Sequence, residues 1–288
     1  MSDGEWLVIE TLSDSPTVVA AGSRVRKWRP LSNVFRGSSL TMVQKLVGVV
    51  VDNLKDSQSL VDLTPGTRLA YARPILGPGR QVHALMVWLG SRDENPPAPP
   101  RALGWSWDVT DPGRPSTVSH PGSADFYGFP PGTEPTLTDL LSTLTDLRDT
   151  AEVLTAVDTA EPDHAGTGEW LMRRPDGRMM KLRYAFRAAR LDGRLYLHGI
   201  CQELPDHIPG PADLLAVDVL GAVAADRPTA LVHTKSGHVR AWLTPPPDSL
   251  PSDVISGDAP LSGILPVSLP GLPESTALGV WEFRSRRQ

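Results

Sequence analysis

The stretch that decides the fold is residues 168–204, which read GEWLMRRPDGRMMKLRYAFRAARLDGRLYLHGICQEL. Two turns, Pro175-Asp176-Gly177 and Leu191-Asp192-Gly193, separate three runs rich in apolar and aromatic residues. Asp-Gly between such runs indicates a hairpin, because glycine adopts the positive φ that tight turns require. From Met180 to Phe186 every second residue is large and apolar, and charged residues or alanine lie between. The segment therefore predicts three antiparallel strands with one buried and one polar face, and a positive φ at Gly177.

The residues before these strands predict another strand and a helical region. Trp105-Ser106-Trp107 alternates large and small side chains, as a half-buried strand does. Thr136 follows a proline and precedes Asp139 by three residues, which is close to a capping box. Apolar residues then recur at three- and four-residue steps, at Leu137, Leu140, Leu144, Leu147, Ala151 and Leu154. This pattern predicts one helix face, or two consecutive helices, packed on the sheet; a coiled-coil dimer is the alternative.

Two proline-rich segments divide the chain. Residues 94–100 (ENPPAPP) and 204–211 (LPDHIPGP) are unsuited to a helix interior or a central strand. We therefore expect domains at residues 1–95, 101–204 and 212–288, of which the last is the smallest. The alternative for residues 94–100 is a ligand for a proline-binding module.

The outer units repeat the order of strands, helix and hairpin. In the first, we expect strands at 6–12 and 17–21, a helix at 40–54, and a hairpin of 68–76 and 81–89. In the third, we expect a helix at 212–225, a hairpin of 230–234 and 239–243, and a strand at 277–283. The fold class is therefore expected to be α+β, with helices on one face of each antiparallel sheet. The 212–225 helix is the expected contact surface, toward the middle unit or a second subunit.

Three motifs of the middle unit carry a family resemblance. They are Trp105-Ser106-Trp107-Asp108-Val109, Phe126-Tyr127-Gly128-Phe129, and the turn from Arg173 to Arg178 with the hairpin after it. Together they resemble a PAS domain over residues 103–204. The whole chain, opening on EWLVIETL at residues 5–12, is similar to mycobacterial and other actinobacterial proteins built as tandem PAS–GAF–PAS modules. The resemblance implies three tandem PAS/GAF-like domains and a role in signal sensing or protein interaction, with no particular chemistry.

Composition and charge exclude several classes of protein. The 288 residues are 40% hydrophobic and 21% charged, which is typical of a folded chain. The net charge of −5 argues against a dedicated nucleic-acid binder, and the basic clusters at 24–29 and 284–287 are interpreted as surface. No apolar run approaches the roughly 20 residues of a membrane span, and no secretory signal pattern opens the chain. We expect a cytoplasmic monomer or homodimer that binds no nucleic acid.

The sequence contains no recognisable catalytic or cofactor motif. Phosphate-binding glycine loops, the nucleophile elbow and the His-Glu-x-x-His pattern are all missing. The single cysteine, Cys201, lies on a predicted strand and is interpreted as a small buried hydrophobe, unlike the helix-borne cysteine of flavin photoreceptors. His233 and His238 flank a turn without further metal ligands beside them, and His164 lies in a predicted loop. We therefore expect no enzyme activity, no cofactor and no metal.

Aromatic residues concentrated in the middle unit offer a candidate ligand pocket. The predicted pocket residues are Trp105, Trp107, Phe126, Tyr127, Tyr184 and Phe186, and the alternative is that these rings form a filled core. The leading hypothesis is a sensory or signalling protein that binds a small ligand or an unidentified protein partner, which carries the output. The alternatives are an enzyme whose catalytic residues cannot be recognised in one sequence, and a pure protein-interaction scaffold.

Overall fold

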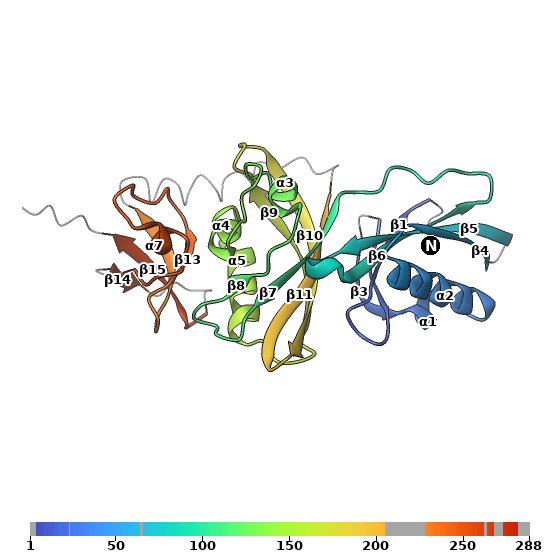
Figure 1. The fold of residues 1–288 in the computed structure, drawn as a ribbon, viewed down its shortest axis with the longest axis horizontal. Helices are drawn as coiled ribbons and strands as arrows, with labels where there is room; N and C mark the ends of the chain where they lie inside the picture. Colours follow the sequence, from blue (N-terminus) through green and yellow to red (C-terminus); the bar gives the residue numbers. More distant parts are fainter. Residues whose placement is uncertain are drawn as a thin grey trace, which may run out of the picture.

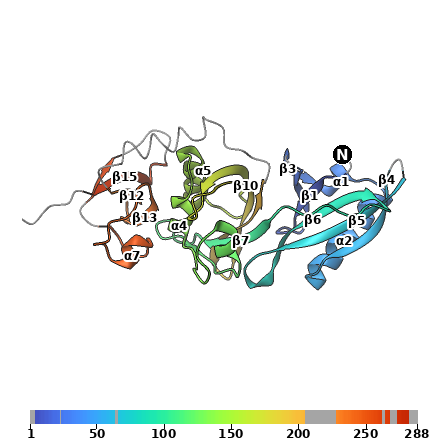
Figure 2. The ribbon, with the colours of Figure 1, turned by 90° about the horizontal axis from the view of Figure 1, so that it is seen from above.

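The computed structural model contains three antiparallel sheets that follow one another along the chain (Figure 1). It describes residues 4–22, 24–63, 66–204, 228–261, 264–267 and 273–281. The proline-rich residues 205–211 and the helix expected at 212–225 lie outside these ranges. Figure 2 shows the three units in a row, with the middle unit between the other two. Among the described residues, no helix is long and apolar enough to cross a membrane.

The first unit is a six-stranded sheet in the order β3-β2-β1-β6-β5-β4. Its strands are β1 (Trp6–Glu10), β2 (Thr17–Ala21), β3 (Arg24–Pro30), β4 (Ser57–Leu63), β5 (Gly66–Leu76) and β6 (Val82–Ser91). Helices α1 (Leu31–Val34) and α2 (Ser38–Asn53) cover one face, and the short 3-10 turn η1 (Pro78–Arg80) lies between β5 and β6. The predicted helix and hairpin are confirmed. Strand β3 was not predicted, because its basic residues lie exposed at the sheet edge.

The middle unit is a five-stranded sheet in the order β8-β7-β11-β10-β9. It consists of β7 (Ala102–Asp108), β8 (Ser116–Thr117), α3 (Ser123–Tyr127), α4 (Leu137–Ser142), α5 (Leu147–Asp158), β9 (Ala165–Arg173), β10 (Met179–Leu191) and β11 (Arg194–Glu203). The three strands predicted from residues 168–204 are confirmed, since Tyr184 of β10 pairs with Gly168 on one side and Cys201 on the other. The positive φ of Gly177 is confirmed as well, at 83°.

The leucine pattern of the middle unit forms two helices, α4 and α5. Thr136 caps α4 in a full capping box: its Oγ1 accepts from the Asp139 N–H at 3.1 Å, and the Asp139 carboxylate accepts from the Thr136 N–H at 2.8 Å. Leu137, Leu140 and Leu154 are buried in the same core as the sheet. These three leucines therefore pack inside the unit and do not form a coiled-coil surface.

The third unit is a four-stranded sheet in the order β13-β12-β15-β14. It contains β12 (Thr229–His233), β13 (Val239–Trp242), α7 (Ser252–Ile255), β14 (Ile264–Val267) and β15 (Thr276–Trp281). Leu231 and Ala241 pack into the core of the middle unit, where β13 lies against α4. The other side of the β12–β13 hairpin forms a small core of its own with Val254 and Leu261.

The expected α+β class, with helices on one face of each PAS/GAF-like sheet, is wrong. Strands take up 42% of the structure and helices 20%, with three sheets and six α-helices in the described residues. Helices cover one face of the first and middle sheets, and neighbouring units cover faces that have no helix. The second face of the first sheet, including Trp6 and Trp88, packs against Ala185 and Ile200 of the middle sheet. The third sheet rests on α4, because its described helix, α7, has only four residues. The apolar face of a sheet can be buried equally by a helix or by another sheet.

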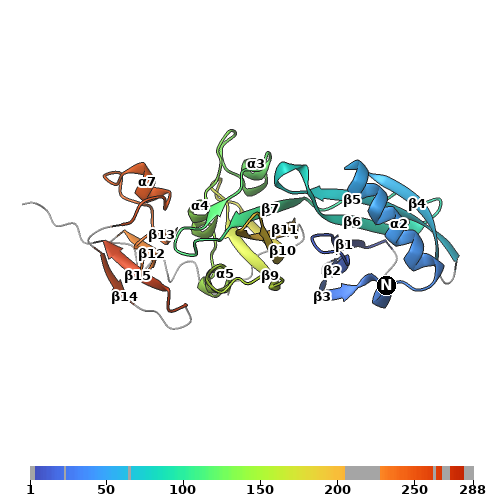
Figure 3. The same cartoon turned by 60° about the horizontal axis from the view of Figure 1, so that its bottom comes forward.

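Buried polar contacts also join the first two units. Glu10, which is 1% exposed, accepts a hydrogen bond from the Thr17 hydroxyl and pairs with Arg187 of β10 at 3.4 Å. Arg183 donates to the Gly22 carbonyl oxygen at 2.9 Å. Figure 3 shows β1 and β6 of the first sheet beside β10 and β11 of the middle one. The first and middle sheets therefore form a continuous packed boundary, with helices on the far side of each.

Candidate ligand-binding site

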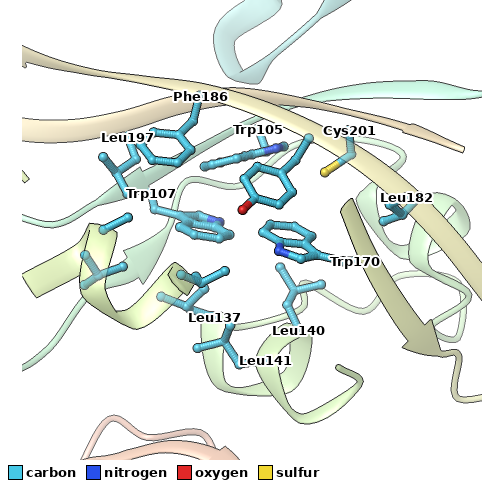
Figure 4. Close-up of a cluster of buried hydrophobic side chains, with 14 of the residues drawn as sticks. Trp105, Trp107, Leu137, Leu140, Leu141, Trp170, Leu182, Phe186, Leu197 and Cys201 are labelled. Carbon is cyan, nitrogen blue, oxygen red and sulfur yellow. The ribbon is translucent and has the colours of Figure 1, made fainter. Parts of the chain in front are cut away.

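The six predicted pocket residues all lie in the buried core of the middle unit. Four aromatic contacts run across the sheet face: Trp105 to Trp107 at 4.2 Å, Trp107 to Trp170 at 6.3 Å, Trp170 to Tyr184 at 4.3 Å and Tyr184 to Phe186 at 6.3 Å. Figure 4 shows Trp107 and Trp170 facing Leu137, Leu140 and Leu141 of α4, with Trp105 on the side away from these leucines. Trp170 is not one of the six predicted pocket residues, and it joins the row from the alternating apolar position of β9 opposite Leu182. Most of this aromatic row is packed core.

A cavity of about 270 Å³ opens where the row meets the short strand β8. Three of the six predicted residues line it, namely Trp105, Trp107 and Tyr127, and Leu137 and Leu141 of α4 complete an apolar floor. The other three, Phe126, Tyr184 and Phe186, do not line it. Phe126 instead lies beneath the Arg101 guanidinium, 5.5 Å from its ring centre.

The third unit supplies one wall of this cavity. His238, Val239 and Arg240 come from the β12–β13 hairpin, and residues 256–258 follow α7. The backbone approaches closely there: a Cβ on Gly257, whose φ is +83°, would lie 2.4 Å from Thr138 Oγ1 of α4. Sequence reasoning did not connect these residues with the pocket, although His238 was considered as a metal ligand, because they lie a hundred or more positions from the strand they face.

Arg240 is the buried charge at this wall. Its side chain is 2% exposed, and its Nη2 donates to Asp158 Oδ1 and to the Pro112 carbonyl oxygen, each at 2.6 Å. Burial lowers the pKa of Arg240, and the neighbouring Asp158 acts in the opposite direction. Its Nε and Nη1 are buried and have no hydrogen-bond partner in the described residues. Arg240 therefore lies in the cavity wall as a buried ion pair with Asp158, and these two nitrogen atoms have no accessible surface toward the cavity.

Two histidines add polar atoms to the same lining. His120 and His238 border the cavity, and each has a buried Nδ1 without a partner among the described residues. Burial lowers the pKa of His120, against the effect of the Leu76 backbone carbonyl. At neutral pH His120 is therefore uncharged. The cavity combines an apolar floor with a few polar and charged residues in its walls, an arrangement typical of small-molecule sites.

The remaining residues that the sequence singled out lie elsewhere. Cys201 is fully buried 3.6 Å from the Tyr127 hydroxyl, and burial raises the pKa of its thiol to about 12, so it is unreactive at neutral pH. His233 binds the Ser236 hydroxyl through Nδ1 at 2.8 Å, and His164 meets the edge of Phe186. No group of three or more His, Cys, Asp or Glu side chains suited to a metal ion occurs in the part of the chain that the structure describes.

The solved structures that resemble this chain include one that covers nearly its whole length. An uncharacterised protein from Mycobacterium tuberculosis superposes with a TM-score of 0.71 at 21% identity, covering 96% of this chain and 95% of the other. A PAS domain of an HTR-like protein from Haloarcula marismortui matches at a TM-score of 0.29 and 16% identity, over 36% of this chain and 81% of the other. That score is too low to support an inference about fold or function.

Comparison with sequence families concerns the first unit. No curated protein matches the chain. The tandem PAS–GAF–PAS arrangement is not confirmed by any of these comparisons. A family model described as Rv3651-like, N-terminal, matches residues 5–98. The chain is therefore similar to that family over its first unit, and its fold is similar to that of the Mycobacterium tuberculosis protein over nearly its whole length.

Proposed function

We propose that this chain is a non-enzymatic sensory protein that binds a small molecule in the cavity between the middle and third units. The observation that carries the proposal is the cavity itself: about 270 Å³, floored by tryptophan and leucine, with His120, His238 and Arg240 among the residues that line it. An apolar cavity of about 150 Å³ already accommodates benzene. The space beside Trp107 therefore suits a molecule larger than benzene, such as a small aromatic metabolite.

The position of the cavity supports a sensory role. A molecule bound there contacts α4 of the middle unit and the β12–β13 hairpin of the third unit together. A ligand shifts an equilibrium by its difference in affinity for the two states, so it stabilises the docked arrangement of these units over an undocked one. A protein partner that distinguishes the two arrangements then carries the output.

The cavity's carboxylates support binding without catalysis. Glu134 and Asp258 lie exposed at the rim, where they accept hydrogen bonds from Ser119 at 2.8 Å and Ser256 at 2.7 Å. Neither is held in the desolvated environment that tunes a carboxyl group for general acid or base catalysis. These carboxylates therefore suit ligand binding better than catalysis.

The test uses N-phenyl-1-naphthylamine, an uncharged dye that fluoresces when it leaves water. We expect saturable binding to the wild-type protein and loss of binding in Val118→Trp, because Val118 lines the cavity and is 37% exposed, so a larger ring at this position obstructs it without disturbing the core. The matched control is Val49→Trp on α2, which is equally exposed at 37% and lies in the first unit. Equal dye binding by the two variants would refute the proposal. Native mass spectrometry of the purified protein would separately identify a retained molecule.

A further inference from the structure

We propose that β4, one edge of the first sheet, pairs with β4 of a second copy of this chain, so that two six-stranded sheets join into one. This inference concerns the first unit and does not depend on the cavity. A strand at a sheet edge has unpaired N–H and C=O groups along its outer side, and these groups can pair with another strand. Folded proteins protect such edges, and β4 lacks the protection that other edges of this chain have.

The opposite edge of the same sheet, β3, is protected by its residues and its shape. Its seven residues include four basic ones and no acidic one, so two copies of β3 would repel each other. Its pairing with β2 is interrupted by a register shift, and the strand ends in Pro30, which has no N–H to donate. This edge is therefore unsuited to pairing with a copy of itself.

The edge strand of the middle sheet, β9, is covered by its own chain. The Thr145 N–H donates to the Leu171 carbonyl oxygen at 2.9 Å, and the Arg173 N–H donates to the Thr143 carbonyl oxygen at 2.7 Å. Residues 143–145 therefore satisfy main-chain groups on the outer side of β9, where another strand would otherwise pair.

Strand β4 has neither kind of protection. Its seven residues contain one charged residue, Asp62, and no lysine or proline, and they pair with β5 in unbroken register from Ser57 to Leu63. In the described part of the chain, β5 is the one strand that pairs with β4. Figures 1 and 2 show β4 on the side of the first unit away from the middle unit. A regular edge with so little charge is suited to pairing with another strand.

The apolar face of the first sheet continues past its cover to β4. Trp88 is fully buried in the cluster that packs against the middle unit, and Leu69 and Tyr71 of β5 are partly buried at the margin of this cluster. Leu60 lies opposite Leu69 and is 39% exposed. A second β4 beside the first would extend this face and cover Leu60.

The charge pattern favours a second copy as the partner. Antiparallel pairing about a two-fold axis at Leu60 places Leu60 opposite itself and Asp62 opposite Gln58, so no two like charges lie opposite each other. Such a contact uses the same strand of both copies and closes on itself. The outer edges of the joined sheet are then the two β3 strands, whose protection stops further growth. The assembly is therefore a dimer.

Sedimentation velocity of the full chain at increasing concentration tests the pairing. We expect a reversible monomer–dimer equilibrium, because a single strand edge is a small interface. Leu60→Lys should raise the dissociation constant of the dimer about tenfold, because it replaces an apolar pair by two like charges. The matched control is Val25→Lys on β3, since Val25 is 38% exposed at the opposite edge of the same sheet. This variant should dimerise like the wild type.

Two further measurements locate the contact. Amide hydrogen exchange in residues 57–63 of the wild-type protein should slow as its concentration rises, because outward N–H groups gain partners, whereas exchange in residues 24–30 should not change. A short bis-maleimide should link two copies of the Leu60→Cys variant and leave Val25→Cys monomeric. The native thiol of Cys201 does not interfere, because it is fully buried.

The outcomes decide the inference independently of the cavity. A chain that stays monomeric at every concentration overturns it, and so does a dimer that Leu60→Lys and Val25→Lys weaken equally. A dimer in which residues 57–63 exchange as fast as in the monomer is held together elsewhere, which overturns the inference as well. Dye binding in the cavity is a separate measurement, so the proposed function and this inference can each fail while the other stands.

Discussion

His83 Nδ1 lies 2.9 Å from the carbonyl oxygen of Gly199, which joins strand β6 of the first unit to strand β11 of the middle one. A carbonyl oxygen only accepts, so Nδ1 carries the proton and donates. His83 is fully buried, its Nε2 has no partner in the described residues, and its ring meets that of His198 edge-on at 5.6 Å. The boundary between these units is therefore built around a neutral histidine.

This arrangement predicts that stability falls in mild acid. Burial lowers the pKa of His83 to about 4. The unfolded chain takes up the proton near its ordinary pKa of about 6.5 while the folded chain does not, so stability is constant above that pH and decreases as the pH falls from it toward 4. At pH 5 the loss from His83 should be about 2 kcal/mol, measured by urea unfolding at pH 7.5 and 5.0.

The control for the pH prediction is His83→Gln, whose amide can still donate to Gly199. Burial also lowers the pKa values of His120, His198 and His233, so part of the acid sensitivity should persist in this variant. The difference between the two proteins isolates His83. An identical loss of stability in both would show that the buried ring is not responsible.

Gly104 of β7 should tolerate no side chain. A Cβ at this position would lie 2.7 Å from the Leu76 carbonyl oxygen and 2.8 Å from the Gly77 Cα, which are main-chain atoms of the first unit. Gly104→Ala should therefore reduce the free energy of unfolding by about 1–3 kcal/mol. Gly48→Ala, in the exposed middle of α2 with open space at its Cβ, should instead stabilise by about 0.5–1 kcal/mol. Chemical denaturation of the two variants distinguishes the steric effect at Gly104 from the helix-propensity effect at Gly48. Equal changes in the free energy of unfolding would contradict the close approach of Gly104 to the main chain of the first unit.

Gly177 tests backbone strain without steric contact. Its φ is +83°, and a Cβ there would meet nothing within 4 Å. Gly177→Val should cost about 1 kcal/mol or more, because a β-branched residue resists this conformation. Gly177→Asn should cost less, since asparagine enters the left-handed region more readily. Thermal unfolding measures both, and an unchanged melting temperature in the valine variant would contradict the assignment.

Thr136 should contribute through its cap of α4. Thr136→Ala removes the acceptor for the Asp139 N–H and should cost about 1 kcal/mol. Thr41→Ala, on the exposed side of α2, is the matched control and should stabilise by about 0.5 kcal/mol, because alanine favours a helix interior more than threonine. If the two substitutions have the same effect in urea unfolding, the capping box does not stabilise the helix.

The candidate site was only partly predictable. Trp105, Trp107 and Tyr127 stand out in the sequence by their type and spacing, and they do line the cavity. Phe126, Tyr184 and Phe186 share the same signal but do not line it. Aromatic type and alternation identify a buried face, and they do not indicate which part of that face remains uncovered.

The sequence by itself determined the local features of this protein: the turn at Gly177, the cap at Thr136, the helix around Val47 and the pairing of the three strands in residues 168–204. These depend on backbone preferences and on neighbours a few positions apart, or on hairpins with short turns. Only the tertiary structure decided what covers each sheet and which residues wall the cavity. Those outcomes depend on contacts such as Arg240 with Asp158, 82 positions apart. Several surfaces can satisfy an apolar face equally well, and docking between units selects one of them.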